Sequence, residues 1–147
     1  MRKNYILSLF VFIAILTNQL FGASEGFTSE MKYETNYQTA ITKAKLEKKP
    51  VMLIISTVSC PWCRKMENQT LKKDEINKIV HDNFTPVALD RDEDEYPEAF
   101  KPQYSPTVLF INPFTNDYFD QSVGYKPYAK FKETLEDAIS NSKIYIK

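Results

Sequence analysis

Two cysteines separated by two residues, Cys60 and Cys63, are the residues best suited to chemistry in this sequence. Thiols at this spacing can pair, and one can attack a disulfide in another molecule while the second resolves the mixed disulfide. Pro61 suits the first turn of a helix, which would put Cys60 at the helix N-terminus, where unpaired N–H groups favour a thiolate. Arg64 and Lys65 add positive charge. We expect Cys60 to be the nucleophile and Cys63 the resolving thiol, with Pro61 and Arg64 lowering the pKa of Cys60.

Other uses of the cysteine pair fit the sequence less well. A structural zinc site needs four ligands, and beyond the pair the chain has one histidine, His81, and no further cysteine. A c-type haem attachment needs histidine directly after the second cysteine, where this chain has Arg64. The acidic run Asp90–Glu95 lacks the glycine and terminal glutamate of an EF-hand, and predicts a solvated loop. We therefore predict no metal and no cofactor, with His81 outside the chemistry. An inert local disulfide stays open as the alternative.

The residues around the pair predict alternating strands and helices. Val51–Ile55 is a continuous apolar run of strand length just before the cysteines, which is typical of a central strand covered on both faces. Apolar periodicity and turn residues set the other bounds. The expected order is helix Met31–Lys49, strand Val51–Ile55, helix Arg64–Leu71, helix Asp74–Asn83, strands Phe84–Leu89, Thr107–Ile111 and Tyr118–Val123, and helix Pro127–Asn141. This order predicts an α/β domain whose central mixed sheet has helices on both faces.

The N-terminal segment has the pattern of a secretory signal peptide. Arg2 and Lys3 precede the apolar stretch Tyr5–Leu16, and small residues follow at 22–24. We expect residues 1–23 to be a cleaved signal peptide and residues 24–147 to form the exported domain, in a periplasm or otherwise outside the cytoplasm. An uncleaved membrane anchor that runs on to Phe21 is the alternative.

Length and charge limit the remaining function classes. The chain has 147 residues, enough for one domain with its own core, and its 19 basic residues balance 19 acidic ones. The chain has no excess of basic residues that would indicate binding to nucleic acid. With a single thiol pair and no evident dimerisation segment, we expect a monomer.

Three features of the sequence together resemble the thioredoxin superfamily. They are the CPWC motif after an apolar strand, the segment Ser105-Pro106-Thr107 that opens a later strand, and Gly124 after the predicted hairpin. The runs KKPVMLIISTVSCPWC and YSPTVLFINP look like those of exported thioredoxin-related proteins of the SoxW type. The resemblance extends from about Tyr33 to Ser140 and implies a thioredoxin fold.

The resemblance also implies roles for residues outside the cysteine pair. Pro106 would be the cis-proline of the family, and Ser105 before it would hold an extended substrate segment through its backbone groups. Trp62 beside Cys60 would contact a protein substrate or shield the disulfide. One position departs from thioredoxin, which has a buried acid six residues before its first cysteine. Here that position is Ile54, so the sequence offers no evident carboxylate to assist Cys63.

These features predict a thiol:disulfide oxidoreductase that exchanges disulfides with exported protein substrates. The resemblance favours reduction over oxidation or isomerisation. A reductase in an oxidising compartment needs an electron donor, and we expect a membrane protein that brings electrons from the cytoplasm. The alternative from another class is a non-catalytic client-binding or chaperone module with the same fold, whose groove near Pro106 holds clients without turnover.

Overall fold

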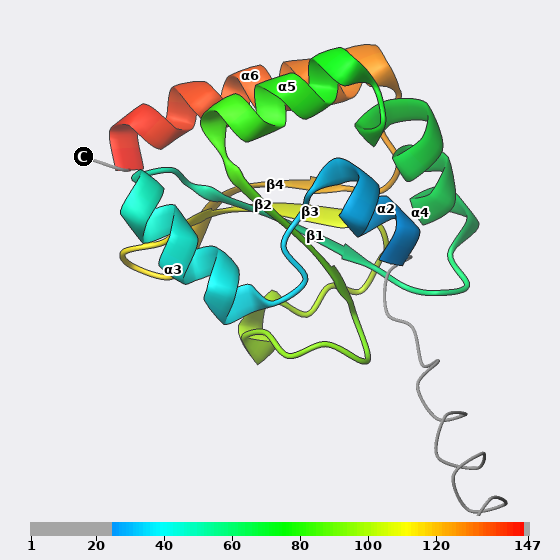
Figure 1. The fold of residues 1–147 in the computed structure, drawn as a ribbon, viewed down its shortest axis with the longest axis horizontal. Coiled ribbons are helices and arrows are strands. Elements are labelled where there is room, and N and C mark those ends of the chain that lie inside the picture. Colours follow the sequence, from blue (N-terminus) through cyan, green and yellow to red (C-terminus); the bar gives the residue numbers. More distant parts are fainter. Residues whose placement is uncertain (1–24, 146–147) are drawn as a thin grey trace, which may run out of the picture.

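The computed structural model describes residues 25–145 and contains one four-stranded sheet (Figure 1). The sheet is mixed: β2 lies parallel to β1, whereas β1 pairs antiparallel with β3 and β3 with β4, in the order β2-β1-β3-β4. The strands are β1 (Val51–Ser56), β2 (Thr85–Asp90), β3 (Thr107–Asn112) and β4 (Asp117–Val123). Each predicted strand is present, with bounds within one residue of those predicted.

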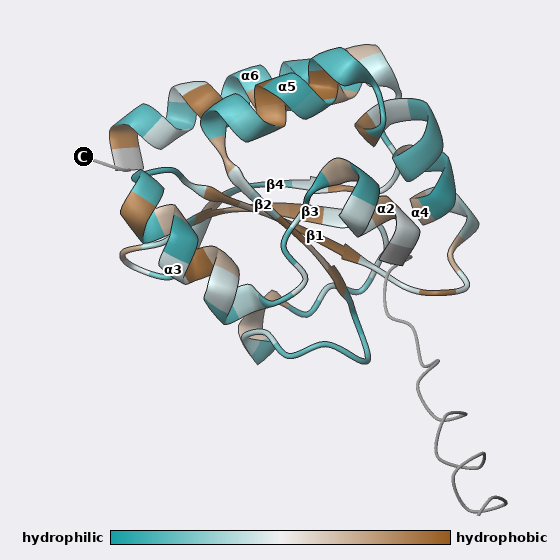
Figure 2. Ribbon diagram, in the orientation of Figure 1, coloured by the Kyte–Doolittle hydropathy of each residue, from teal (hydrophilic) through white to brown (hydrophobic). Residues whose placement is uncertain are grey.

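Helices cover both faces of this sheet, as predicted. One face packs against α3 (Tyr37–Glu47) and the short helix η2 (Glu98–Phe100). The other packs against the remaining helices, which are α2 (Glu25–Met31), α4 (Pro61–Met66) with the wider helical turn η1 (Glu67–Leu71), α5 (Asp74–Asn83) and α6 (Tyr128–Tyr145). Figure 2 shows the apolar residues concentrated in the strands and the polar ones on the outer surfaces of the helices. Within residues 25–145 no helix is both long and apolar enough to cross a membrane.

Strand β1 divides the core into two layers. All six of its residues are buried. Met52 and Ile54 belong to the apolar cluster under α4, α5 and α6, while Leu53 and Ile55 belong to the cluster under α3, because successive side chains of a strand point to opposite faces. This double burial explains why the strand reads as a continuous apolar run. Its C-terminal end leads directly into the loop that carries the cysteines.

The predicted single helix Met31–Lys49 is wrong in its first part. Lys32 has φ 57°, a left-handed conformation that ends α2. Glu34 then lies against the edge of the sheet, where its N–H donates to the Pro86 carbonyl (2.9 Å) and its carbonyl accepts from Ala88 (3.0 Å). Asn36 caps the start of α3 by accepting from Thr39 N at 2.9 Å. The predicted span therefore holds the last residue of α2, an extended segment that includes Tyr33, and α3.

Pro86 is compatible with its strand because β2 lies at the edge of the sheet. The Pro86 carbonyl accepts from Glu34, so the backbone of this residue faces outward, away from β1. Its missing N–H therefore removes no bond between β1 and β2. Proline is tolerated here for a geometric reason.

The acidic run predicted as a solvated loop begins with a residue that is not solvated. Asp90 ends β2 and is 2% exposed. Its Oδ1 accepts from the amides of Asp92 (2.9 Å) and Glu93 (3.2 Å), while the Asp94 carboxylate accepts from Asp90 N at 2.7 Å. These bonds fold the chain into a turn just after the strand. Asp90 is thus a structural residue, and the rest of the run forms the loop.

Three further predictions concern the last helix, His81 and the N-terminal segment. The last helix extends past the predicted Asn141 to Tyr145. His81 is half-buried on α5, with Nε2 2.8 Å from the Met31 carbonyl oxygen. The predicted signal peptide, residues 1–23, lies outside the described residues.

Candidate active site

The two cysteines lie at the start of α4 and form a disulfide, with their Cα atoms 5.3 Å apart. Cys60 caps the helix: its Sγ accepts from the backbone N–H of Cys63 at 3.1 Å, and Pro61 occupies the first turn. The two sulfurs differ in accessibility, because Cys60 is partly exposed whereas Cys63 is only 3% exposed. An incoming thiol or disulfide would therefore reach Cys60 first.

The loop before β3 lies beside the exposed sulfur. The Ser105 carbonyl oxygen is 3.5 Å from Cys60 Sγ, and the Ser105–Pro106 peptide bond is cis. The Pro106 carbonyl accepts from Gly124 N at 2.8 Å. The fold thus brings together the three features of the sequence that are far apart along the chain: the CPWC motif, the Ser-Pro segment and Gly124.

The two cations after the cysteines take different positions. The Arg64 guanidinium donates to the Val58 carbonyl at 3.0 Å, so it holds the loop that leads into Cys60. The Lys65 ammonium lies 5.0 Å from the ring centroid of Trp62 and 4.6 Å from that of Tyr125. Both are cation–π distances. Lys65 therefore links the tryptophan of the motif to a residue of the loop after β4.

Tyr125 is a site residue that the sequence analysis did not identify. Its ring lies 5.9 Å from that of Trp62, and its hydroxyl donates to Gln69 Oε1 at 3.2 Å. Its position directly after Gly124 is the one signal in the sequence that places it here. Trp62 stays 56% exposed despite these contacts. Lys65 and Tyr125 therefore contact part of the Trp62 ring, while the rest of the ring stays exposed to solvent.

An open pocket of about 490 Å³ adjoins the disulfide. Its lining comes from three elements of the chain that are distant in sequence, namely the start of α4, the loop before β3 and the end of β4. The residues are Trp62, Tyr104, Ser105, Val123, Gly124 and Tyr125. The pocket offers aromatic side chains and backbone polar groups next to the exposed sulfur, which suits a polypeptide segment.

The position that carries an acid in thioredoxin is apolar here, as the sequence indicates. Ile54 is 4% exposed and packs in the cluster between the sheet and α4. Its partner across the β1–β2 pair is Ala88, which is also apolar and buried. This position of the sheet therefore supplies no carboxylate that could assist Cys63.

Several known proteins resemble this chain in sequence or in fold. Residues 37–139 match the family model described as a thioredoxin-like domain. Spermatogenesis-associated protein 20 of Rattus norvegicus is 39% identical over 56 residues, which cover 38% of this chain and 7% of that protein. A thioredoxin from Thermus thermophilus has a TM-score of 0.62 at 20% identity, over 71% of this chain and 85% of the other. A structure described as DsbH oxidoreductase gives 0.61 at 20% identity, over 73% and 83%. The likeness to the solved structures shows the fold.

Proposed function

This chain belongs to the family of thioredoxin-like domains, and we propose that it is a thiol:disulfide oxidoreductase that exchanges disulfides with exported proteins through Cys60 and Cys63. The observation that carries the proposal is the arrangement of the disulfide. It closes the first turn of α4 with one sulfur partly exposed, the other buried, and the loop of Pro106 beside the exposed one. A disulfide that only stabilised the fold would not require one exposed and one buried sulfur. A bridge across so few residues also constrains the unfolded chain little.

The reaction proceeds by two thiol–disulfide exchanges. In the reduced protein, the Cys60 thiolate attacks a client disulfide, forms a bond to one client sulfur and releases the other as a thiolate. The Cys63 thiolate then attacks Cys60 Sγ and releases the second client sulfur. The client gains two electrons and, at neutral pH, two protons, while the protein returns to the Cys60–Cys63 disulfide. The reverse sequence oxidises a client dithiol.

The residues around Cys60 have proposed roles in this exchange. The Cys63 N–H, which donates to Cys60 Sγ, favours the thiolate over the thiol. Pro61 and Arg64 support the same shift, Pro61 by starting the helix and Arg64 by its charge and its bond to the preceding loop. Trp62, Ser105 and Pro106 contact the client, Trp62 through its exposed ring and the other two through the backbone beside the sulfur.

The direction and the location of the reaction rest on the sequence. The resemblance to thioredoxin-related reductases favours reduction, with oxidation and isomerisation as alternatives. The pattern of residues 1–23 favours a cleaved signal peptide and a domain, residues 24–147, that works outside the cytoplasm as a monomer. A reductase there needs a dithiol donor, which we assign to a membrane protein that carries electrons from the cytoplasm.

A non-catalytic client-binding module is the second candidate. The exposed apolar surface next to the disulfide favours it, since Tyr104 is 68% and Val123 43% exposed. A client that binds this surface would not need to exchange electrons. The two candidates differ in whether the thiols are required.

Cysteine variants of the full chain separate the two candidates. Reduced wild-type protein should reduce the disulfides of a model protein, Cys60→Ser should lose this activity, and Cys63→Ser should accumulate a mixed disulfide through Cys60, visible by mass spectrometry. Retained reduction in Cys60→Ser would contradict the assignment of the nucleophile. Client binding that is unchanged in the double variant, with no exchange in the wild type, would favour the binding module.

A further inference from the structure

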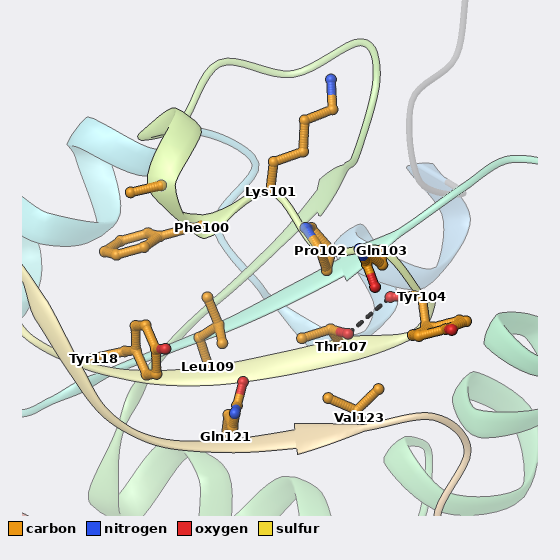
Figure 3. Close-up of a pocket in the computed structure, with 11 residues that line it drawn as sticks. Phe100, Lys101, Pro102, Gln103, Tyr104, Thr107, Leu109, Tyr118, Gln121 and Val123 are labelled. Carbon is orange, nitrogen blue, oxygen red and sulfur yellow. Dashed lines mark hydrogen bonds between the residues drawn. The ribbon is translucent and has the colours of Figure 1, made fainter.

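A second pocket continues the one beside the disulfide. Tyr104 and Val123 line both, so the two hollows meet at these residues. The second pocket has a volume of about 270 Å³ and lies over β3 and β4 on the face of the sheet that α3 covers elsewhere (Figure 3). Figure 3 shows Tyr104 and Val123 at one end and Phe100 and Tyr118 at the other, with Thr107 and Leu109 between them. We call these six residues the distal groove.

Within residues 25–145, no long helix covers the part of the sheet at the distal groove. Helix α3 packs over β2 and β1. On this face of β3 and β4, the described residues supply only η2 and the irregular segment after it. Tyr118 is therefore 45% exposed, whereas Leu109 on β3 is buried at 3%. The strands contribute Thr107, Leu109, Gln121 and Val123 to the lining, and aromatic side chains lie at both ends (Figure 3).

A bulge in β4 turns Tyr118 toward the groove. Val123 and Tyr118 pair with Thr107 and Ile111 on β3, but the register shifts between Phe110 and Ile111. Regular alternation from Val123 would put residue 119 on the groove face and residue 118 on the other. With the extra residue, Phe119 packs instead against the opposite cluster, and Tyr118 faces the groove, where its ring lies 5.9 Å from that of Phe100. Two aromatic side chains thus close the distal end.

The lining suits the side chains of an extended polypeptide. The whole lining of the second pocket includes no acidic residue, and its polar side chains include Gln103, Thr107 and Gln121. Its single charged side chain, Lys101, has its ammonium 3.7 Å from Asp92. Thr107 Oγ1 donates to the Tyr104 carbonyl at 2.8 Å, which fixes the backbone where the two pockets meet (Figure 3). The carbonyl of the next residue, Ser105, adjoins Cys60 Sγ. A client chain whose sulfur is bound at Cys60 would therefore lie next to Tyr104 and Val123, the two residues at which the pockets meet.

We propose that the distal groove binds the client polypeptide on one side of its reactive cysteine and selects clients with a large apolar residue about four to six positions from that cysteine. This inference rests on the proposed function, because it assumes that the client reacts at Cys60. The spacing follows from β3: Leu109 and Ile111 lie four and six residues beyond Ser105. At roughly 3.3 Å per extended residue, the same span of client reaches from the sulfur to Phe100 and Tyr118.

Peptides with one cysteine, held as a mixed disulfide with glutathione, test the spacing. A phenylalanine is placed two, five or nine residues from the cysteine, on either side, in an otherwise polar sequence. Reduced full-length protein transfers two electrons to each peptide disulfide, which releases peptide thiol and glutathione, and chromatography measures the rate. We expect the five-residue spacing to react about tenfold faster than an alanine control, the gain expected from burying one large apolar side chain. Equal rates at all spacings would overturn the proposal.

Two matched variants locate the effect. Tyr118→Ser removes an exposed aromatic side chain from the groove, and Phe114→Ser removes one that is 55% exposed in the turn before β4, outside the groove. The tenfold advantage should disappear in Tyr118→Ser and persist in Phe114→Ser, while both variants reduce glutathione disulfide at the wild-type rate. An advantage that survives in Tyr118→Ser would overturn the groove as its cause.

Two further measurements separate failure of the groove from failure of the proposed function. A fluorescent peptide with serine in place of cysteine cannot react, so its binding measures the affinity of the groove alone. Loss of this binding in Tyr118→Ser supports the groove even if the protein reduces no disulfide. Conversely, reduction of glutathione disulfide with no preference among peptides supports the function and contradicts the groove. Sedimentation of the same variants tests whether a second copy of the chain fills the groove. If the wild type self-associates, Tyr118→Ser does not, and peptide binding is the same in both, the occupant is a second copy and the proposed client is overturned.

Discussion

The Cys60 sulfur lies 3.5 Å from the carbonyl oxygen of Ser105, a residue 45 positions further along the chain. The same sulfur accepts from the N–H of Cys63 at 3.1 Å. One contact can accept a thiol hydrogen and the other supports a thiolate, so the two protonation states of reduced Cys60 have different partners. Under the proposed function, a client bound at the Ser105 backbone would therefore lie next to a contact of this sulfur.

The first prediction concerns the charge state of reduced Cys60. Its alkylation by iodoacetamide should rise with pH and reach a plateau below the pH at which a free cysteine does, because the thiolate is the reactive form and a hydrogen bond from the Cys63 N–H would favour it. Arg64→Gln should move the curve to higher pH and slow alkylation at pH 7 by about two- to threefold. Lys130→Gln, which removes an exposed lysine on α6, is the control and should leave the curve in place. Identical alkylation curves for wild type and Arg64→Gln would show that Arg64 only holds the loop before Cys60 in place and does not affect the charge state of the thiol.

The second prediction concerns the direction of electron flow. Equilibration with glutathione or dithiothreitol buffers, followed by the fluorescence of Trp62, should give a reduction potential near about −270 mV, the value of thioredoxin. A protein at that potential reduces client disulfides when a donor supplies electrons. A value near about −120 mV would instead identify an oxidant of newly exported chains. Trp62 is a suitable reporter because it is the one tryptophan and directly precedes Cys63.

The parts of the fold that the sequence predicts well are those with a local cause. Val51–Ile55 reads as a buried strand because both of its faces are covered, and the CPWC motif indicates a strand-to-helix junction because Pro61 starts a helix. The extended segment around Glu34 could not be predicted from a local pattern of this kind. Its partner is the edge of β2, and its apolar neighbours keep helical spacing by coincidence.

The functional site likewise combines features with a local cause in the sequence and features that depend on tertiary packing. The positions of Cys60, Cys63 and Ser105 follow from motifs, whereas the contact of Lys65 with Tyr125 depends on where the loop after β4 packs. The distal groove depends on a single-residue bulge in β4, for which the sequence around Tyr118 has no glycine or other mark. Such features arise from register and from the short cover over β3, which are properties of the assembled sheet.

The third prediction concerns Asp90 as the residue that fixes the turn after β2. Asp90→Ala should lower the free energy of unfolding by about 1–3 kcal/mol, because the amides of Asp92 and Glu93 lose the buried Asp90 carboxylate as their acceptor. Asp90→Asn keeps an oxygen at the same place and should cost less. Urea denaturation of both variants measures the difference. If the two variants were equally unstable, the charge of Asp90 rather than its hydrogen bonds would be the stabilising feature.

The fourth prediction concerns Lys65, whose ammonium lies between the rings of Trp62 and Tyr125. Lys65→Met keeps a chain of similar length over the rings but removes the charge, and should lower the free energy of unfolding by about 0.5–1 kcal/mol. It should also free the Trp62 ring, which we expect to see as lower fluorescence anisotropy. Lys65→Arg retains a cation that can stack on both rings and should restore the anisotropy.

The same pair of variants distinguishes support of the tryptophan from a purely electrostatic role at the cysteines. If Lys65 acts by holding Trp62, Lys65→Met should slow reduction of peptide disulfides more than reduction of glutathione disulfide, because only the peptide is long enough to cover the Trp62 ring. If it acts through its charge on Cys60, both substrates should slow equally and the alkylation curve should move to higher pH. Unchanged anisotropy together with a shifted curve would therefore replace the first explanation by the second.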